Sequence, residues 1–517
     1  MKYVAFDLGA SSGKLFEGQL RGNSLQIAPV YSFPNGVVCL RDGMYWDFLR
    51  IFSELVTGLR RAEASGQVDS LGVDSYNNDF SLIDANGEML IPVRSYRDSR
   101  TQKHWDAIFG IMPMREVYMH SGNQIAPFNT LMQLAAMNLN GQHFLLENAH
   151  RLLMLPDLLG YYITGRTGIE YTVAAETELM NLATKQWIEP IFAAYDIPRR
   201  LMPELRMPGT ILGPSAPEFN ARHHLRGFDF VNVCEHDTAS AFLASPLDRD
   251  AILISSGTWA LVGLETGAPV VNDFTYRSNI ANEGGLDGHH RLLRNVMGSW
   301  LIQELRRDYA LDGLELDFPT IQKLALEAAP FRFPLDPDAP EFYLPNDMRR
   351  KIRDVSLRLN GTAPETPGEY FRCVYEALVM KYRYCIELLE SAVGRSYGTV
   401  NIFGGGCQDQ LCNQFVADAC GRRVVAGPID ASSIGNIVVQ MLAHGELSGM
   451  EEAKAVVRNS FDFMEFVPKA YDEWNRHYPD FLRLFEENSP AYVPRSSTCS
   501  AAGHESKSGR NEPCSSR

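Results

Sequence analysis

The sequence predicts an α/β protein of two lobes, with its functional site in the cleft between them. Two observations favour this fold. The chain opens with a strand, a turn of small residues and a second strand, and the same unit recurs far downstream. Apolar residues also recur every three to four positions over residues 295–310 and 367–393, which predicts amphipathic helices. Chance similarity between the two hairpins is the alternative to two related lobes.

The first unit comprises an apolar strand over residues 3–6, a small-residue turn over 9–13 and a second strand over 14–20. Small residues let backbone N–H groups approach a phosphate, and Asp7 at the strand end could orient a hydrated Mg²⁺. A P-loop is excluded, because Leu15 follows Lys14 where that motif needs serine or threonine. A simple tight turn remains the alternative.

The second unit begins with the apolar residues 251–254, turns at Ser255-Ser256-Gly257-Thr258 and continues as a strand over 259–264. A third glycine element lies further on, where Gly404-Gly405-Gly406 follows a strand at 400–403 and precedes a helix at 410–419. Three glycines leave bare backbone on which a flat ligand such as adenine could lie. By themselves they are also compatible with a purely structural loop.

Asp237 is the candidate for acid–base chemistry. A strand over residues 228–234 runs into Glu235-His236-Asp237-Thr238, and a helix-prone segment follows at 239–243. A carboxylate at the carboxyl end of a strand is well placed to meet a substrate in an α/β cleft. Aspartate is also a favoured helix N-cap, so a capping role is the alternative.

Two further polar clusters follow strand-like segments, at residues 74–79 and 97–100. Asparagine and aspartate are common in turns, so each cluster alone is compatible with a structural role. If they converge on one cleft, they would form a site for a polyhydroxylated ligand.

Composition sets broader limits. The 517-residue chain has a formal net charge of −15, which argues against a nucleic-acid partner. Its nine cysteines form no CxxC pair, Asp7 comes too early in the chain for the pattern of a signal peptide, and no apolar run is long enough to span a bilayer. We expect a cytoplasmic protein with a lobe at 1–245, a lobe at 246–480 and a C-terminal extension at 481–517. The extension lacks large apolar residues after Val493 and is predicted to be disordered from about residue 494.

Taken together, the chain resembles the FGGY family of carbohydrate kinases, and its rhamnulokinase branch in particular, over residues 3 to about 470. The matching motifs are Asp7-Leu8-Gly9-Ala10-Ser11-Ser12-Gly13, Tyr96-Arg97-Asp98-Ser99-Arg100, Pro127-Phe128-Asn129-Thr130-Leu131, His236-Asp237-Thr238-Ala239-Ser240, Ser255-Ser256-Gly257-Thr258-Trp259, Asn282-Glu283-Gly284-Gly285 and Gly404-Gly405-Gly406-Cys407-Gln408.

The resemblance implies two actin/Hsp70-like (ribonuclease H-like) lobes, each a mixed sheet flanked by helices, closing over ATP and a sugar. It implies transfer of the γ-phosphate of ATP to the 1-hydroxyl of L-rhamnulose, with Mg²⁺ as cofactor and Asp237 as catalytic base. The residues expected at the sugar are Asn77, Asn78, Asp79, Arg97, His236, Thr238 and Asn295. Those expected at the nucleotide are Asp7, Ala10, Ser11, Ser12, Gly13, Lys14, Gly257, Thr258, Gln303, Gly404, Gly405 and Asn413, with Asp7 also holding Mg²⁺ through water.

One departure bears on specificity. Rhamnulokinases carry Trp-Gly-Val-Asp where this chain has Tyr76-Asn77-Asn78-Asp79, and the glycine is a sugar contact in that family. The alternatives are therefore a kinase of a related ketose or polyol (L-fuculose, L-xylulose or L-ribulose) or a non-catalytic sugar-binding member. An actin-like ATPase is a third possibility. We expect a monomer or a homodimer.

Overall fold

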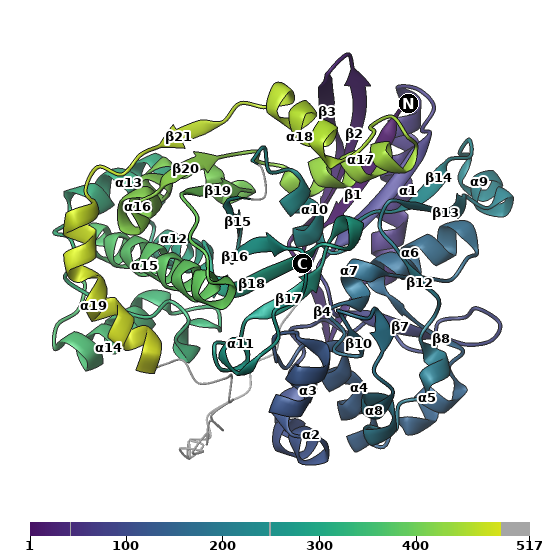
Figure 1. The fold of residues 1–517 in the computed structure, drawn as a ribbon, viewed down its shortest axis with the longest axis horizontal. Coiled ribbons are helices and arrows are strands. Elements are labelled where there is room, and N and C mark those ends of the chain that lie inside the picture. Colours follow the sequence, from purple (N-terminus) through teal and green to yellow (C-terminus); the bar gives the residue numbers. More distant parts are fainter. Residues whose placement is uncertain (42, 248–249, 488–517) are drawn as a thin grey trace, which may run out of the picture.

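The computed structural model describes residues 1–41, 43–247 and 250–487, and within them the chain forms two lobes, each built on a mixed β-sheet (Figure 1). The first sheet has the strand order β13-β14-β6-β1-β2-β3. Its strands are β1 (Tyr3–Leu8), β2 (Ser12–Arg21), β3 (Ser24–Pro34), β6 (Ser70–Ser75), β13 (Thr210–Pro214) and β14 (Asp229–Asn232).

The second sheet has the order β17-β18-β16-β15-β19-β20-β21. Its strands are β15 (Ile252–Ser256), β16 (Trp259–Thr266), β17 (Ala281–Gly284), β18 (His290–Met297), β19 (Thr399–Phe403), β20 (Arg423–Ala426) and β21 (Met464–Phe466). In both sheets an antiparallel hairpin, β1-β2 or β15-β16, pairs in parallel with the next core strand, β6 or β19. The predicted repetition of one unit at the start of each lobe is confirmed.

Helices cover the sheets, and the first lobe also carries a mainly helical subdomain with several two-stranded sheets (Figure 1). The helices before the second sheet are α1 (Phe48–Ala64), α2 (Trp105–Ile111), α3 (Met114–Ser121), α4 (Thr130–Leu139), α5 (His143–Asn148), α6 (Leu155–Thr164), α7 (Tyr171–Ala174), α8 (Glu189–Ala194), α9 (Pro217–His223) and α10 (Asp237–Leu243). The two-stranded sheets pair β4 (Val37–Leu40) with β5 (Gly43–Trp46), β7 (Phe80–Ile83) with β8 (Arg151–Met154), β9 (Ile169–Glu170) with β12 (Leu205–Arg206) and β10 (Met180–Asn181) with β11 (Gln186–Trp187).

The second half of the chain supplies α11 (Asp273–Arg277), α12 (Trp300–Leu311), α13 (Phe318–Glu327), α14 (Met348–Asn360), α15 (Pro367–Val393), α16 (Gln410–Cys420), α17 (Ala431–Ala443), α18 (Met450–Ser460) and α19 (Tyr471–Glu487). The helix predicted over 367–393 is confirmed, and a capping box at Thr366 and Glu369 begins it. The helix predicted over 295–310 is wrong at its start, because residues 295–297 complete strand β18 and the helix begins at Trp300.

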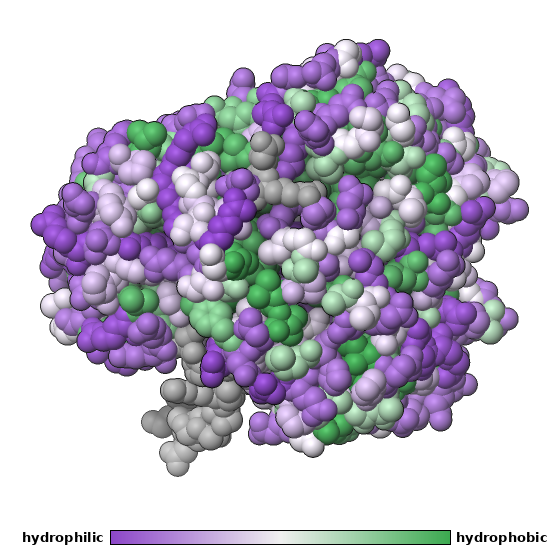
Figure 2. All heavy atoms as spheres, viewed as in Figure 1, coloured by the Kyte–Doolittle hydropathy of each residue, from purple (hydrophilic) through white to green (hydrophobic). Residues whose placement is uncertain are grey.

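The two halves of the chain do not form separate cores. Helix α17 comes from the second half, yet it packs against β1 and β6 of the first sheet and crosses α10. One apolar cluster accordingly joins Tyr3 and Ala5 of β1 with Ile434 and Ile437 of α17. Figure 2 shows apolar side chains gathered along the middle of one face, where the lobes meet, and mainly hydrophilic ones over the lobe at the left. The lobes are therefore held together by buried apolar surface.

The C-terminal boundary differs from the prediction. Helix α19 runs across residue 480, and Phe481, Leu484 and Phe485 on it are buried. Helix α19, which includes residues 481–487, packs on α15 and α16. The tail predicted to be disordered lies outside the described residues. Within those residues, no helix combines the length and hydropathy needed to cross a membrane.

Candidate active site

Asp237 occupies the first turn of α10, directly after the loop that follows β14. Its carboxylate does not cap the helix; His236 is the N-cap residue, and it makes no side-chain capping bond. The capping alternative for Asp237 is therefore wrong. The Asp237 side chain is 30% exposed, while its neighbours His236 and Thr238 are buried. A partly exposed carboxylate in a buried setting remains accessible to a ligand.

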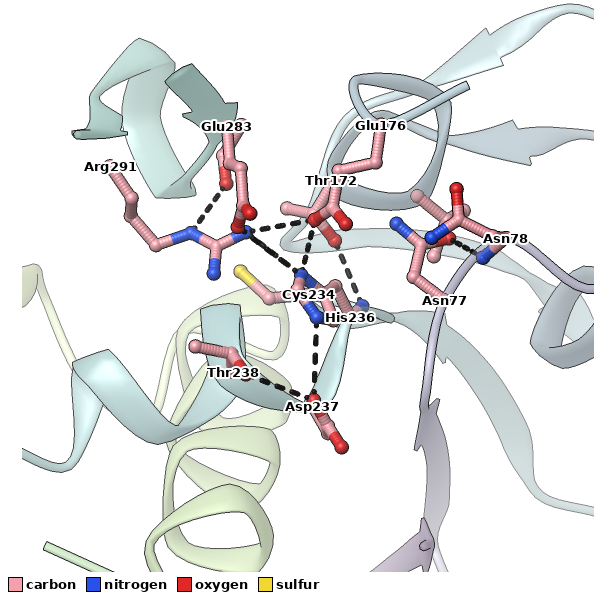
Figure 3. Close-up of polar contacts among 12 residues, drawn as sticks. Asn77, Asn78, Thr172, Glu176, Cys234, His236, Asp237, Thr238, Glu283 and Arg291 are labelled. Carbon is pink, nitrogen blue, oxygen red and sulfur yellow. Dashed lines mark hydrogen bonds and ion pairs between the residues drawn. The ribbon is translucent and has the colours of Figure 1, made fainter. Parts of the chain in front are cut away.

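Among the described residues, the hydrogen-bond and ion-pair partners of Asp237 all lie at one carboxylate oxygen, Oδ1. The hydroxyl of Thr238 donates to Oδ1 at 3.1 Å, and Nε2 of His236 lies 3.4 Å from the same atom (Figure 3). Oδ2 accepts no hydrogen bond from the part of the chain that the structure describes. It is therefore the atom able to accept a proton from a substrate hydroxyl.

The loop before Asp237 is fixed by Glu170, which the sequence did not single out. Its carboxylate accepts hydrogen bonds from the backbone N–H groups of Thr172 and Glu235, at 2.8 and 3.2 Å. The Thr172 hydroxyl in turn accepts the N–H of His236 at 3.1 Å. This buried scaffold holds the turn that presents His236 and Asp237 in a single conformation.

Asp7 and Asp74 stand side by side on the neighbouring parallel strands β1 and β6. Burial, together with the negative charge of Asp237, raises the pKa of Asp7 to about 7. Burial and then the charge of Asp7 raise the pKa of Asp74, although Asn436 donates to one of its oxygens at 2.6 Å. The other oxygen, Oδ1, is buried without a hydrogen-bond partner. Crowded carboxylates with an orphaned oxygen fit a nearby cation.

The first small-residue turn faces the loop that begins α17. Lys14 lies beside Asp430, with 3.5 Å between Nζ and Oδ1, and both side chains are partly exposed. The Ala10-Ser11-Ser12 turn is closed by a hydrogen bond from the N–H of Gly9 to the carbonyl of Ser12. Gly13 has a packing role instead, because a Cβ atom there would lie 2.3 Å from the ring of Phe33.

The other predicted nucleotide residues converge on the β15-β16 turn. Gly257 and Thr258 accept backbone hydrogen bonds from the segment that begins α12. On that helix, Gln303 donates to Oγ of Ser299 at 2.9 Å, and the same Ser299 hydroxyl donates to the carbonyl of Gly257. Residues far apart in the sequence therefore form one surface around this turn.

The three consecutive glycines differ in role. Gly404 has φ of +82°, and a Cβ atom at Gly406 would lie 2.0 Å from Oγ of Ser256, so both are needed for packing. A Cβ atom at Gly405 would meet nothing within 4 Å. Asn413 is fully buried beneath this loop and donates to the carbonyl of Cys407 at 2.7 Å. It therefore supports the loop, while its Oδ1 is buried without a hydrogen-bond partner, and the predicted contact with nucleotide stays a prediction.

The open space at Gly405 leads to a prediction. Gly405→Ala should raise the KM for ATP about tenfold, roughly 1.4 kcal/mol of binding, because its methyl group would enter the space expected for the nucleotide. The melting temperature should not change. Steady-state kinetics with varied ATP measure this, and Gly398→Ala, another site with open space around it, is the control. An unchanged KM would argue against nucleotide contact at Gly405.

The sugar-side residues occupy two positions. Asn77 and Asn78 are buried, and Oδ1 of Asn77 accepts the N–H of Asn78 at 2.6 Å. Nδ2 of Asn77 and Oδ1 of Asn78, however, are buried without partners. The amides thus serve the turn in part and retain groups for a ligand. Asn295, on β18, donates to Gln124 of the first lobe at 3.1 Å and links the two lobes.

Asp79 and Arg97 lie beside aromatic side chains. Asp79 accepts a hydrogen bond from the indole of Trp46, and burial raises the pKa of Asp79 to about 8. The Trp46 ring stacks on that of Tyr76, with 4.4 Å between the ring centroids. Arg97 is exposed and lies over the ring of Tyr96. Asp79 therefore supports an aromatic wall, and Arg97 lies at its rim.

Behind His236 is a buried charged cluster that the sequence reasoning missed. Glu176, Glu283 and Arg291 surround Nδ1 of His236, and all four side chains are almost inaccessible to solvent (Figure 3). The two glutamates and the histidine could in principle bind a metal ion. The guanidinium of Arg291 already supplies a positive charge there, 2.9 Å from Glu283 and 3.5 Å from Glu176.

The two-lobed α/β fold is shared with solved sugar kinases. The structure superposes on the xylulose kinase of Lactobacillus acidophilus with a TM-score of 0.79 at 14% identity, covering 94% of this chain and 98% of that one. It superposes on the glycerol kinase of Plasmodium falciparum with a TM-score of 0.77 at 15% identity, covering 95% and 99%.

The sequence identifies the family. Models of the FGGY family of carbohydrate kinases match residues 46–244 with the N-terminal domain and residues 252–444 with the C-terminal domain. A rhamnulokinase of Oceanobacillus iheyensis is 33% identical over 465 residues, 90% of this chain and 98% of the relative. A rhamnulokinase of Yersinia pestis is 35% identical over 490 residues, 93% and 98%. The chain belongs to the FGGY family of carbohydrate kinases, and it is an ATP-dependent sugar kinase.

Proposed function

We propose that this kinase transfers the γ-phosphate of ATP to the 1-hydroxyl of L-rhamnulose. The observation that carries the proposal is the free Oδ2 of Asp237, whose charge acts on Asp7, within a chain whose relatives are rhamnulokinases over nearly their full length. Asp237 orients the sugar hydroxyl and accepts its proton as the bond to phosphorus forms. Phosphoryl transfer depends mainly on such positioning and on neutralisation of charge.

The same proposal assigns residues to the nucleotide. The Ala10–Ser12 turn and Lys14 approach the phosphates from the first lobe, and Gly257, Thr258, Gln303 and Gly405 approach the nucleotide from the second. Asp7 would hold Mg²⁺ through water, with the orphaned oxygen of Asp74 beside it. When bound, the ion neutralises phosphate charge. A free Asp237 oxygen favours this reading over a non-catalytic sugar-binding member.

Substrate choice depends on the unpartnered amide groups of Asn77 and Asn78. A buried amide that loses water needs a partner, so these groups favour a sugar that offers a hydroxyl to them. This observation keeps a second candidate open, a ketose with a differently placed hydroxyl.

We expect L-rhamnulose to have the highest kcat/KM among L-rhamnulose, L-fuculose, L-xylulose and L-ribulose. Asn77→Gly should change these ratios by roughly 10–100-fold, because one buried hydrogen bond is worth about 1–3 kcal/mol. An ADP-release assay with Mg²⁺ and ATP measures both. The matched control is Asn86→Gly in an exposed turn, which should leave the ratios unchanged. If another ketose has the higher kcat/KM, the protein is still a kinase but L-rhamnulose is not its preferred substrate. If Asn77→Gly leaves the ratios unchanged, Asn77 does not contact the sugar.

A further inference from the structure

His236 lies between the candidate base and a buried ion network, which we define as Glu176, His236, Glu283 and Arg291 (Figure 3). Nδ1 of His236 contacts Glu176, lies 3.1 Å from Nη2 of Arg291 and is 3.5 Å from Glu283. Nε2 on the other side of the ring is 3.4 Å from Oδ1 of Asp237. The imidazole therefore connects the network directly to the catalytic carboxylate.

With both glutamates ionised, the charges in this network balance when His236 is protonated. Two carboxylates face one guanidinium, and a buried charge without a partner is costly. Burial lowers the pKa of His236, but the charge and the hydrogen bond of Glu176 outweigh it and raise the pKa to about 10. Asp237, 3.4 Å from Nε2, is also acidic, whereas the charge of Arg291 opposes protonation of the ring. An imidazolium has two N–H donors and no acceptor.

Because Glu176 holds a proton on Nδ1, Nε2 carries a proton only in the imidazolium, and that second proton determines which oxygen of Asp237 is free. The Nε2–H of an imidazolium points a donor at Oδ1, which the Thr238 hydroxyl also contacts, so Oδ2 is left for the substrate. A neutral imidazole with its single proton on Nδ1 would point the lone pair of Nε2 toward Oδ1 and repel it. The partners come from both lobes, Glu283 and Arg291 from β17 and β18 and the others from the first lobe.

We propose that Glu176, with Glu283 and Arg291, is a positioning residue of the kinase: it keeps His236 as a double donor, and His236 in turn orients Asp237 with Oδ2 toward the sugar hydroxyl. The proposal rests on the proposed function, because it concerns the base of that reaction. Glu176 itself touches no reacting atom and acts through His236.

The first test is Glu176→Gln, which retains the shape of the side chain and removes its charge. We expect kcat to fall by about 10–100-fold, the usual effect of losing a supporting partner, with the KM for ATP unchanged. The ratio of variant to wild-type kcat should also fall as pH rises from about 6 to 9. At a pH below the lowered pKa of His236 in the variant, His236 is still an imidazolium. At a higher pH it loses its second N–H donor. A ratio that is constant with pH would overturn the proposal.

Glu178→Gln is the matched control. Glu178 is a buried carboxylate two positions away that pairs with Asn129 at 2.8 Å instead of His236. Its replacement should leave the pH profile parallel to that of the wild type. In a His236→Gln background, Glu176→Gln should have almost no further effect on kcat, because residues that act in series are not additive. Additive losses would show that Glu176 has a separate, structural role.

Histidine-selective ¹⁵N NMR decides the proposal without any turnover. At pH 8 the His236 signal, assigned with His236→Gln, should be that of an imidazolium in the wild type and of a neutral ring in Glu176→Gln. A neutral His236 in the wild type would overturn the proposal even if the enzyme phosphorylates ketoses. Absence of turnover with every sugar would instead contradict the proposed function, and the NMR result would still stand.

Discussion

Asp237→Asn should lower kcat for ketose phosphorylation by about 10²–10⁴-fold, the usual contribution of a general base. Asparagine has nearly the same shape, and the Thr238 hydroxyl can still donate to its oxygen, so the loop and α10 should fold as before. The amide cannot accept the proton of the sugar hydroxyl. Steady-state kinetics at saturating ATP and sugar, with circular dichroism as a check of folding, measure the effect.

Asp317→Asn is the matched control for that variant. Asp317 caps helix α13 with its side chain, and asparagine caps a helix equally well. Its activity should remain that of the wild type. If Asp237→Asn also phosphorylates sugar at nearly the wild-type rate, Asp237 is not the base.

Gly435→Ala should cause the largest loss of stability, because Gly435 lies where α17 crosses α10. A Cβ atom there would lie 1.8 Å from the carbonyl oxygen of Ser240, which is backbone and cannot rotate away. The helices must separate, and overpacking of this kind costs about 3 kcal/mol of unfolding free energy. Because α10 begins with Asp237, kcat should fall as well.

Thermal unfolding and denaturant titration measure that loss. The control is Gly110→Ala in helix α2, where a Cβ atom would meet nothing within 4 Å. There we expect a small gain in stability of about 0.5–1 kcal/mol, since alanine has the higher helix propensity. Equal stability of Gly435→Ala and wild type would mean that the two helices can move apart without cost.

Local patterns in the sequence were sufficient for much of the fold. The hairpins at β1-β2 and β15-β16 are short apolar strands around glycine and serine turns, so neighbouring residues determine them. The start of α12 was misplaced because residues 295–297 are compatible with either period, and pairing with β16 decides for strand. The packing of α17 on the first sheet is a contact between distant segments and leaves no local signal.

The candidate site was predicted unevenly for the same reason. Asp237 was found because a carboxylate follows a strand and precedes a helix. Asp74 was classified with turn residues, although it is a buried strand residue opposite Asp7. Glu283 and Arg291 face each other across the β17-β18 hairpin, and Glu176, far earlier in the sequence, meets them only in the folded chain. Their burial, which makes them important to His236, is a tertiary property.

The central claim is that the protein moves the γ-phosphate of ATP to a ketose, and ³¹P NMR of a single reaction mixture tests it most directly. With wild-type protein, Mg²⁺, ATP and L-rhamnulose, we predict that the γ-phosphate signal is replaced by equal amounts of ADP and a sugar 1-phosphate. Without sugar, ATP should persist. Release of inorganic phosphate at the same rate with and without sugar, and no phosphomonoester from any ketose, would contradict the claim and indicate an ATPase.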